Sequence, residues 1–201
     1  MCEKNIIFDL DHTLGFFEQM IHIMHHSDFS CHEVLDFFPE CFRPLLIDFL
    51  KSLIPYKKSG KIKSILLYSN NNNHSFVETV IRYIHKTIDY DLFDKIITMD
   101  DPLRKKKQKD YDDLLYISQG LLHEGSVICF VDDKMHTLMN KSNVCYIKCE
   151  GYVYLFKQSV ILERIQKDIP KYIFKKRCLN QNNQQQISRL LVQRIRIFIL
   201  R

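Results

Sequence analysis

Residues 6–14 read Ile6-Ile7-Phe8-Asp9-Leu10-Asp11-His12-Thr13-Leu14. The stretch is a short apolar run followed directly by two carboxylates that lie two positions apart. Short, continuous apolar runs rich in Ile and Val are typical of strands buried on both faces of a parallel sheet. An extended chain alternates its side-chain direction with a period of two, so Asp9 and Asp11 are predicted to point into the same pocket.

Two further apolar runs have the same form. Residues 65–68 precede the pair Ser69-Asn70, and residues 127–131 precede the pair Asp132-Asp133. Apolar residues recur at helical spacing between and after these runs, and Ser75-x-x-Glu78 resembles a capping box. The predicted helices cover residues 76–88, 114–122 and 160–169, the last ended by Pro170.

Strands that alternate with helices predict an α/β fold with a doubly wound parallel sheet. In such sheets, ligands bind beyond the carboxyl ends of the strands, at the point where the strand order reverses. All three polar clusters follow a predicted strand, so we expect them to meet at this edge of the sheet. We expect a small insert after the first strand and a basic tail at the C-terminal end.

The acidic residues of these clusters predict a site for Mg²⁺. Asp9, Asp11, Asp132 and Asp133 offer hard oxygen ligands, which Mg²⁺ prefers, with water and substrate phosphate completing the shell. One Asp can attack the phosphorus, and another can protonate the leaving oxygen and then activate water. Ser69 and a lysine from residues 104–109 can hold the phosphate oxygens.

These motifs, in this order, resemble those of the haloacid dehalogenase-like (HAD) phosphatases. Within that superfamily the chain is most similar to the branch that acts on the carboxy-terminal domain of RNA polymerase II and related phosphoproteins (the FCP/SCP branch). Residues 43–50, Arg-Pro-Leu-Leu-Ile-Asp-Phe-Leu, resemble its Arg-Pro-Gly-x-x-x-Phe-Leu segment, and residues 109–115 resemble its Lys-Asp-Leu segment. The resemblance covers roughly residues 5–170. His12 stands where the branch has Glu, and Leu45 where it has Gly.

The resemblance implies a role for each matching residue. Asp9 would be the nucleophile, Asp11 the general acid and base, and Lys109 the phosphate clamp, although Arg104 and the lysines at 105–107 compete for that assignment. Asp132 would bind Mg²⁺ with Asp9 and Asp11, and Asp133 would be a nearby ligand or acid. The residues implied around the phosphate are Ser69, Asn70 and Thr13, the last also as a support of the loop.

The predicted activity is therefore Mg²⁺-dependent hydrolysis of phosphomonoesters through an aspartyl-phosphate, with phosphoserine or phosphothreonine of a protein as the preferred substrate. A phosphatase of small metabolites or of nucleic-acid 3′-phosphates is an alternative. A phosphoprotein-binding module without turnover is an alternative from another class.

Composition and charge predict how the chain is organised. Of its 201 residues, 46% are hydrophobic and 26% charged, which is typical of a globular domain. The N-terminal residues show no secretory leader and the seven cysteines form no CxxC pair, so we expect an intracellular protein, cytoplasmic or nuclear, with reduced thiols. Residues 156–201 carry 11 Lys and Arg against 2 Asp and Glu. The predicted divisions are a phosphatase domain at 1–175, a polar Asn/Gln linker at 176–186 and a basic amphipathic tail at 187–201.

Two segments have open interpretations. Residues 15–42 fit the position of a flap or cap. The same residues also suggest a zinc site, which the absence of a CxxC partner disfavours; its candidate ligands are His22, His25, His26, Cys31 and His32. The tail is predicted either to dock on the body of the protein or to contact nucleic acid, a membrane surface or a partner protein.

Overall fold

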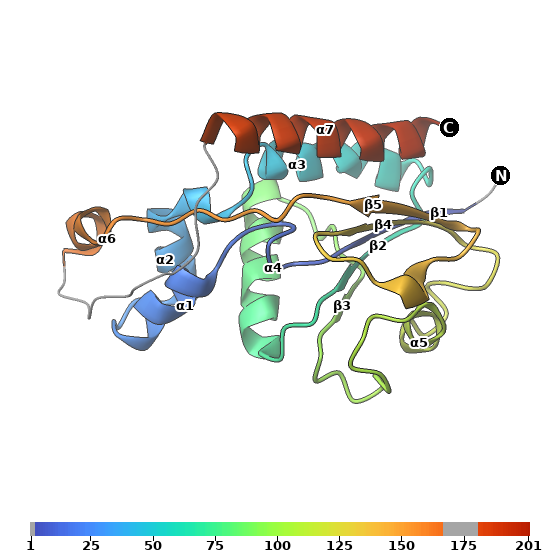
Figure 1. Ribbon diagram of the computed structural model, residues 1–201, viewed down its shortest axis with the longest axis horizontal. Coiled ribbons are helices and arrows are strands. Elements are labelled where there is room, and N and C mark those ends of the chain that lie inside the picture. The colour runs from blue at the N-terminus through green and yellow to red at the C-terminus, as the bar shows by residue number, and fades with distance from the viewer. Residues whose placement is uncertain (1–2, 167–180) are drawn as a thin grey trace.

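The computed structural model describes residues 3–166 and 181–201. Five parallel strands form one sheet in the order β3-β2-β1-β4-β5 (Figure 1). The strands are β1 (Lys4–Phe8), β2 (Ser64–Tyr68), β3 (Lys95–Ile97), β4 (Val127–Asp132) and β5 (Val144–Lys148). The helices are α1 (Glu18–His25), α2 (Cys31–Phe37), η1 (Pro39–Cys41), α3 (Leu46–Lys58), α4 (His74–Ile88), α5 (Tyr111–Ile117), η2 (Thr137–Met139), α6 (Gln158–Ile165) and α7 (Gln181–Leu200). The predicted α/β fold with a parallel sheet is confirmed.

The sheet is buried on both faces because successive residues of its central strands are apolar. Ile6 and Phe8 belong to one hydrophobic cluster, while Ile7 between them belongs to another. Residues of β2 and β4 divide between the same two clusters in the same alternating way. The first cluster includes side chains of α3, α4 and α7, and the second includes those of α5. This period of two is what a strand covered on both faces requires.

The order of strands reverses beside β1. The chain passes from β1 to β2 and β3 on one side, then returns to β4 and β5 on the other. β1 and β4 are therefore neighbours, with Phe8 opposite Val131 and the Asp9 N–H donating to the Val131 carbonyl over 2.9 Å. This register brings the residues that follow both strands to a common edge, where the three polar clusters were predicted to meet.

Several predicted boundaries differ from the observed ones. α4 begins at His74 because the Asn73 side chain accepts the Phe76 N–H, so the capping box predicted at Ser75 is not the cap. α5 spans Tyr111–Ile117, so it begins and ends earlier than the helix predicted over residues 114–122. α6 ends at Ile165, and Ile169 lies outside the described residues. β3 and β5 have no counterpart among the predicted strands.

The C-terminal segment is a helix that packs on the body of the protein. Residues 181–186, predicted as part of a linker, form the first turns of α7, while 176–180 lie outside the described residues. Gln is a good helix former, and the apolar residues that follow supply a buried face. Leu191, Ile195 and Ile199 are buried in the first hydrophobic cluster, and Lys4 Nζ donates to the Ile199 carbonyl over 2.9 Å.

Residues 15–42 form α1, α2 and η1. Tyr83 of α4 donates a hydrogen bond from its hydroxyl to Asp36 of α2, so α2 lies against α4. The ring centroids of His22 and His26 lie 4.3 Å apart, with the two ring planes tilted by 44°. Within the described ranges, no helix is long and apolar enough to span a membrane.

Candidate active site

The turn after β1 is tightly constrained. The Leu10 carbonyl accepts hydrogen bonds from the N–H groups of residues 13–15. His12 adopts the left-handed backbone conformation, with φ of 64°. A Cβ at Gly15 would lie 2.7 Å from the Cys41 carbonyl oxygen, so the close approach of these two backbones requires glycine. The chain thus turns tightly between Leu10 and Gly15, with its left-handed residue directly after Asp11.

Lys109 lies at the centre of the site. Its ammonium group donates to Asp9 Oδ1 over 2.5 Å and to Asp132 Oδ2 over 2.6 Å, and its side chain is only 1% exposed. It precedes α5, whose N-cap Asp110 accepts the Asp113 N–H. The lysines at 105–107 are exposed instead. Of the cations at 104–109, Lys109 is the one whose side chain contacts Asp9 and Asp132.

Three carboxylates form a compact group at the ends of β1 and β4. Oxygen atoms of Asp9, Asp132 and Asp133 lie within 4.8 Å of one another. Three ionised carboxylates and the one ammonium of Lys109 leave the group with two net negative charges. Hard oxygen donors with this net charge suit a divalent cation such as Mg²⁺. The group can hold a metal ion, which the geometry alone does not identify.

Burial and local charges perturb these carboxyl groups. Burial raises the pKa of Asp9 to about 6 against the opposing charge of Lys109. Burial also raises the pKa of Asp133 above its ordinary value. Burial acts in the same direction on Asp132, but its contacts with His136 and Lys109 outweigh burial and hold its pKa below the ordinary value. Adjacent carboxyl groups with pKa values moved apart are a feature of functional sites.

Asp11 does not join the three-carboxylate group. Its Oδ2 accepts a hydrogen bond from Asn71 Nδ2 over 2.9 Å, and Asn71 belongs to the loop after β2. The role of Asp11 as a fourth carboxylate ligand stays a prediction. Asn71 itself was not predicted, although it lies in the run of four asparagines at 70–73.

The predicted phosphate-binding residues lie in a loop braced by Arg104. Ser69 is buried, and its hydroxyl oxygen accepts the Asn71 N–H over 3.1 Å. Arg104 donates to the Ser69 carbonyl over 2.7 Å and to Asn70 Oδ1 over 2.5 Å. Its guanidinium also lies over the ring of Tyr68. Arg104, considered only as a rival of Lys109, thus fixes the loop that carries Ser69 and Asn70.

Thr13 and Arg43 stabilise the turn after β1 and the loops that contact it. Thr13 is buried, and its hydroxyl accepts the Asp133 N–H over 3.1 Å, so it supports the loop after β4. Arg43 donates to the carbonyls of His12, Thr13 and Glu150 over 2.8, 2.6 and 2.7 Å. The sequence places the Arg43-Pro44 pair only in the segment that resembles the FCP/SCP branch and predicts no role for it at the site. One buried guanidinium thereby joins three stretches of chain.

His136 is a further neighbour of the carboxylates. Its ring Nε2 lies 3.3 Å from Asp132 Oδ2, and its backbone N–H donates to the Tyr146 hydroxyl over 3.0 Å. Its position four residues after Asp132 is the only sequence signal that it carries, and a single histidine at that spacing is too common to identify a site.

Comparison of the chain with models of protein families, with curated proteins and with solved structures found no match. The function must therefore be inferred from the three-carboxylate group, Lys109 and the residues that hold them at this edge of the sheet.

Proposed function

We propose that the protein is a Mg²⁺-dependent phosphatase that hydrolyses phosphomonoesters through an aspartyl-phosphate on Asp9. The observation that carries this proposal is the contact of buried Lys109 with both Asp9 and Asp132, beside Asp133. Asp11 is not one of the three grouped carboxylates and accepts a hydrogen bond from Asn71, which suits a different chemical task. The order of these motifs, similar to that of the HAD phosphatases, points to the same activity.

Asp9, Asp132 and Asp133 would hold the metal ion. When bound, Mg²⁺ supplies Lewis-acid stabilisation of negative charge on the phosphate oxygens. The protein contributes a rigid set of ligands, because Asp132 Oδ1 also accepts the Lys134 N–H over 2.7 Å and the Asp133 N–H is held by Thr13. A preorganised set of this kind loses little free energy to reorganisation during the reaction.

Asp9 would act as the nucleophile. Lys109 contacts its Oδ1, which leaves Oδ2 to form the bond to phosphorus as the bond from phosphorus to the leaving oxygen breaks. Lys109 also places a positive charge where negative charge gathers on the phosphoryl oxygens. A water molecule then forms a bond to the phosphorus, and the bond to Asp9 breaks to release phosphate.

Asp11 would move the protons of both steps. Its carboxyl group gives a proton to the leaving oxygen in the first step and takes one from the attacking water in the second, so the enzyme ends as it began. The hydrogen bond from Asn71 fixes the orientation of this carboxylate. Ser69 and Asn70 would bind the phosphate oxygens, in a loop that Arg104 keeps in place.

The substrate that we propose is phosphoserine or phosphothreonine in a protein. This choice rests on the similarity of residues 43–50 and 109–115 to the branch that acts on phosphoproteins. Mg²⁺ is the proposed cofactor because all three ligands are carboxylates, without the imidazole or thiolate that softer metals favour.

The test is hydrolysis of p-nitrophenyl phosphate by the full chain with Mg²⁺ and with EDTA. We expect Mg²⁺-dependent turnover that falls on the order of 10³-fold or more in Asp9→Asn and in Asp11→Asn. The matched control is Asp112→Asn, an exposed carboxylate of α5, which should keep full turnover. Calorimetric melting of each variant checks that it folds.

The outcomes separate the alternatives. Turnover of the aryl phosphate that survives in Asp9→Asn contradicts the assigned nucleophile. If no variant turns over p-nitrophenyl phosphate or a panel of phosphopeptides and nucleotides, while phosphopeptides bind the wild type, the protein is a binding module and the proposal fails.

A further inference from the structure

A groove lies between α3 and α7, lined by side chains of both helices and by Leu45. In Figure 1 the two helices run side by side along one border of the molecule. The groove has a volume of about 550 Å³. We call it the α3–α7 groove; the residues on which its properties depend are Leu45, Phe49, Arg189, Arg196, Ile197 and Leu200.

Large apolar side chains in this groove remain exposed to water. Leu45 is 43% exposed, Ile197 42% and Leu200 63%. Phe49 and Val192 lie beside them in the same groove. Exposed apolar residues scattered singly are ordinary on protein surfaces, but several that line one concave surface indicate an interaction site.

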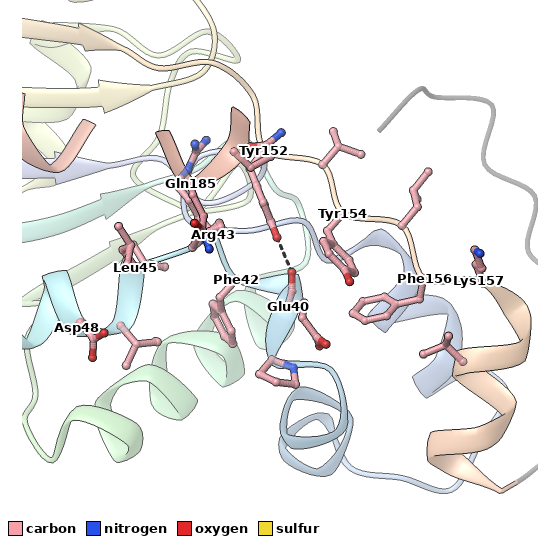
Figure 2. Close-up of a pocket in the computed structure, with 18 residues that line it drawn as sticks. Glu40, Phe42, Arg43, Leu45, Asp48, Tyr152, Tyr154, Phe156, Lys157 and Gln185 are labelled. Carbon is pink, nitrogen blue, oxygen red and sulfur yellow. Dashed lines mark hydrogen bonds between the residues drawn. The ribbon is translucent and has the colours of Figure 1, made fainter. Parts of the chain in front are cut away.

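Leu45 has an unusual backbone conformation for a leucine. It precedes α3 in the left-handed region, with φ of 65° and no side-chain hydrogen bond that caps the helix. This conformation strains any residue with a Cβ, and strain retained without a packing benefit marks functional positions. The Leu45 side chain also lines a second groove of about 780 Å³ beside residues 152–157, with Tyr152 and Phe156 across from it (Figure 2). Leu45 is thus presented to two adjoining grooves.

The charge of α7 indicates what the groove attracts. Residues 181–201 contain four arginines and no acidic residue. In the described part of the chain, the arginines that pair with carboxylates are Arg82 and Arg164, so those of α7 are left for another partner. Arg189 and Arg196 both line the α3–α7 groove, seven residues and roughly 10 Å apart along the helix. Asp48 is the acidic residue at the groove, which leaves it a net positive charge.

We propose that the α3–α7 groove binds an acidic amphipathic helix of another protein. The stretch of α7 from Arg189 to Leu200 spans roughly 17 Å, the length of about three helical turns. A partner helix of that length would bury apolar side chains against Leu45, Ile197 and Leu200. Acidic side chains seven residues apart would pair with Arg189 and Arg196. A concave surface with apolar residues between its arginines suits helix-in-groove recognition better than a flat bilayer surface.

The proposal does not depend on phosphatase activity, and a binding measurement tests it. The probe is a fluorescein-labelled 14-residue peptide with Leu and Ile at helical spacing and Glu at the other positions. The matched probe carries Lys in place of each Glu. We expect fluorescence polarisation with the full-length protein to show saturable binding of the acidic peptide, at least about tenfold tighter than that of the basic peptide.

Variants localise the binding. Leu45→Gly keeps the fold because glycine adopts the left-handed backbone without strain, and it should weaken binding about tenfold. Ile197→Ser provides a second apolar test, and the double variant Arg189→Gln/Arg196→Gln should weaken binding and remove its dependence on salt. The matched controls are Leu138→Ala and Arg82→Gln, which change exposed residues of the same types outside the groove.

Three results would overturn the proposal. The first is equal binding of the acidic and basic peptides. The second is acidic-peptide binding that none of the three groove variants changes. The third is binding of the protein to phosphatidylserine vesicles without binding of the peptide, which would assign this surface to a membrane.

Discussion

Asn71 Nδ2 lies 2.9 Å from Asp11 Oδ2, so a residue from the loop after β2 orients the carboxylate proposed as general acid and base. The same asparagine is fixed in turn, because its Oδ1 accepts the Asn73 N–H over 2.9 Å and its N–H is bound by Ser69. The orientation of Asp11 is therefore linked to the loop proposed to bind phosphate.

This relationship predicts the effect of Asn71→Leu. A hydrogen bond to a charged group contributes about 1.5–3 kcal/mol, so we expect kcat for p-nitrophenyl phosphate to fall about tenfold or more. KM should change little, because the phosphate-binding side chains remain. Asn72→Leu, an exposed neighbour, is the matched control. An unchanged kcat in Asn71→Leu would show that Asn71 does not orient Asp11 during turnover.

Replacement of Lys109 by Met tests the electrostatic balance of the site. The variant leaves Asp9 and Asp132 buried without their cation, and breaking a buried ion pair in this way costs about 3–5 kcal/mol of stability. Mg²⁺ should restore part of this loss, so the rise in Tm on adding Mg²⁺ should be larger in Lys109→Met than in the wild type. Turnover should be lost with or without the metal.

Lys106→Met serves as the control for that measurement. Lys106 is an exposed cation that pairs with Asp110 over 2.7 Å, and its replacement should change Tm little. A Lys109→Met variant whose Tm equals that of the wild type in EDTA would contradict the assigned role of the ammonium group.

His85 predicts a dependence of stability on pH. Its Nε2 accepts the Phe93 N–H over 3.1 Å, which requires a neutral ring at that atom. Burial lowers the pKa of His85 in the folded protein, despite the nearby Asp91. The unfolded chain then binds more protons below the ordinary histidine pKa of 6.5, so the free energy of unfolding should decrease as the pH falls through that value. The decrease should level off below the folded pKa.

Urea unfolding of the wild type and of His85→Gln between pH 7.5 and 5 measures this effect. The glutamine side chain accepts a hydrogen bond without titrating, so the variant should lose less stability on acidification than the wild type. His25→Gln, an exposed histidine of α1, should behave as the wild type does. Parallel curves for His85→Gln and the wild type would rule out His85 as the source.

The sequence alone predicts the central part of the sheet because its strands are buried on both faces. Residues 6–8, 65–68 and 127–131 are apolar without interruption, which a short loop rarely is. β3 has three residues, and β5 is an edge strand with Cys145 and Lys148 exposed, so neither carries a distinct pattern. The formation of an edge strand depends on pairing with residues that are distant in the sequence rather than on a pattern in its own residues.

The same distinction applies to the candidate site. The meeting of Asp9 and Asp132 is expected because each directly follows or ends a strand of one parallel sheet, which the alternation of strands and helices predicts. Lys109 follows no predicted strand, and its assignment comes from the resemblance to the HAD phosphatases. The hydrogen bond between Asn71 and Asp11 does not follow, because it depends on the tight turn formed by the left-handed His12 and by the contact of Gly15 with Cys41. The backbone conformation of His12 and the position of Gly15 both depend on packing between distant segments, which no local sequence pattern predicts. His136 was missed for the same reason.

The central position of β1 has a consequence for the protein as it is synthesised. β1 is made first, yet Ile6 pairs with Cys129 of β4 on one of its sides. Until the ribosome has delivered β4, the nascent chain carries an apolar strand with one edge unpaired, and Asp9 has neither Lys109 nor Asp132 beside it. A chain truncated before β4 should therefore need a chaperone to stay out of aggregates.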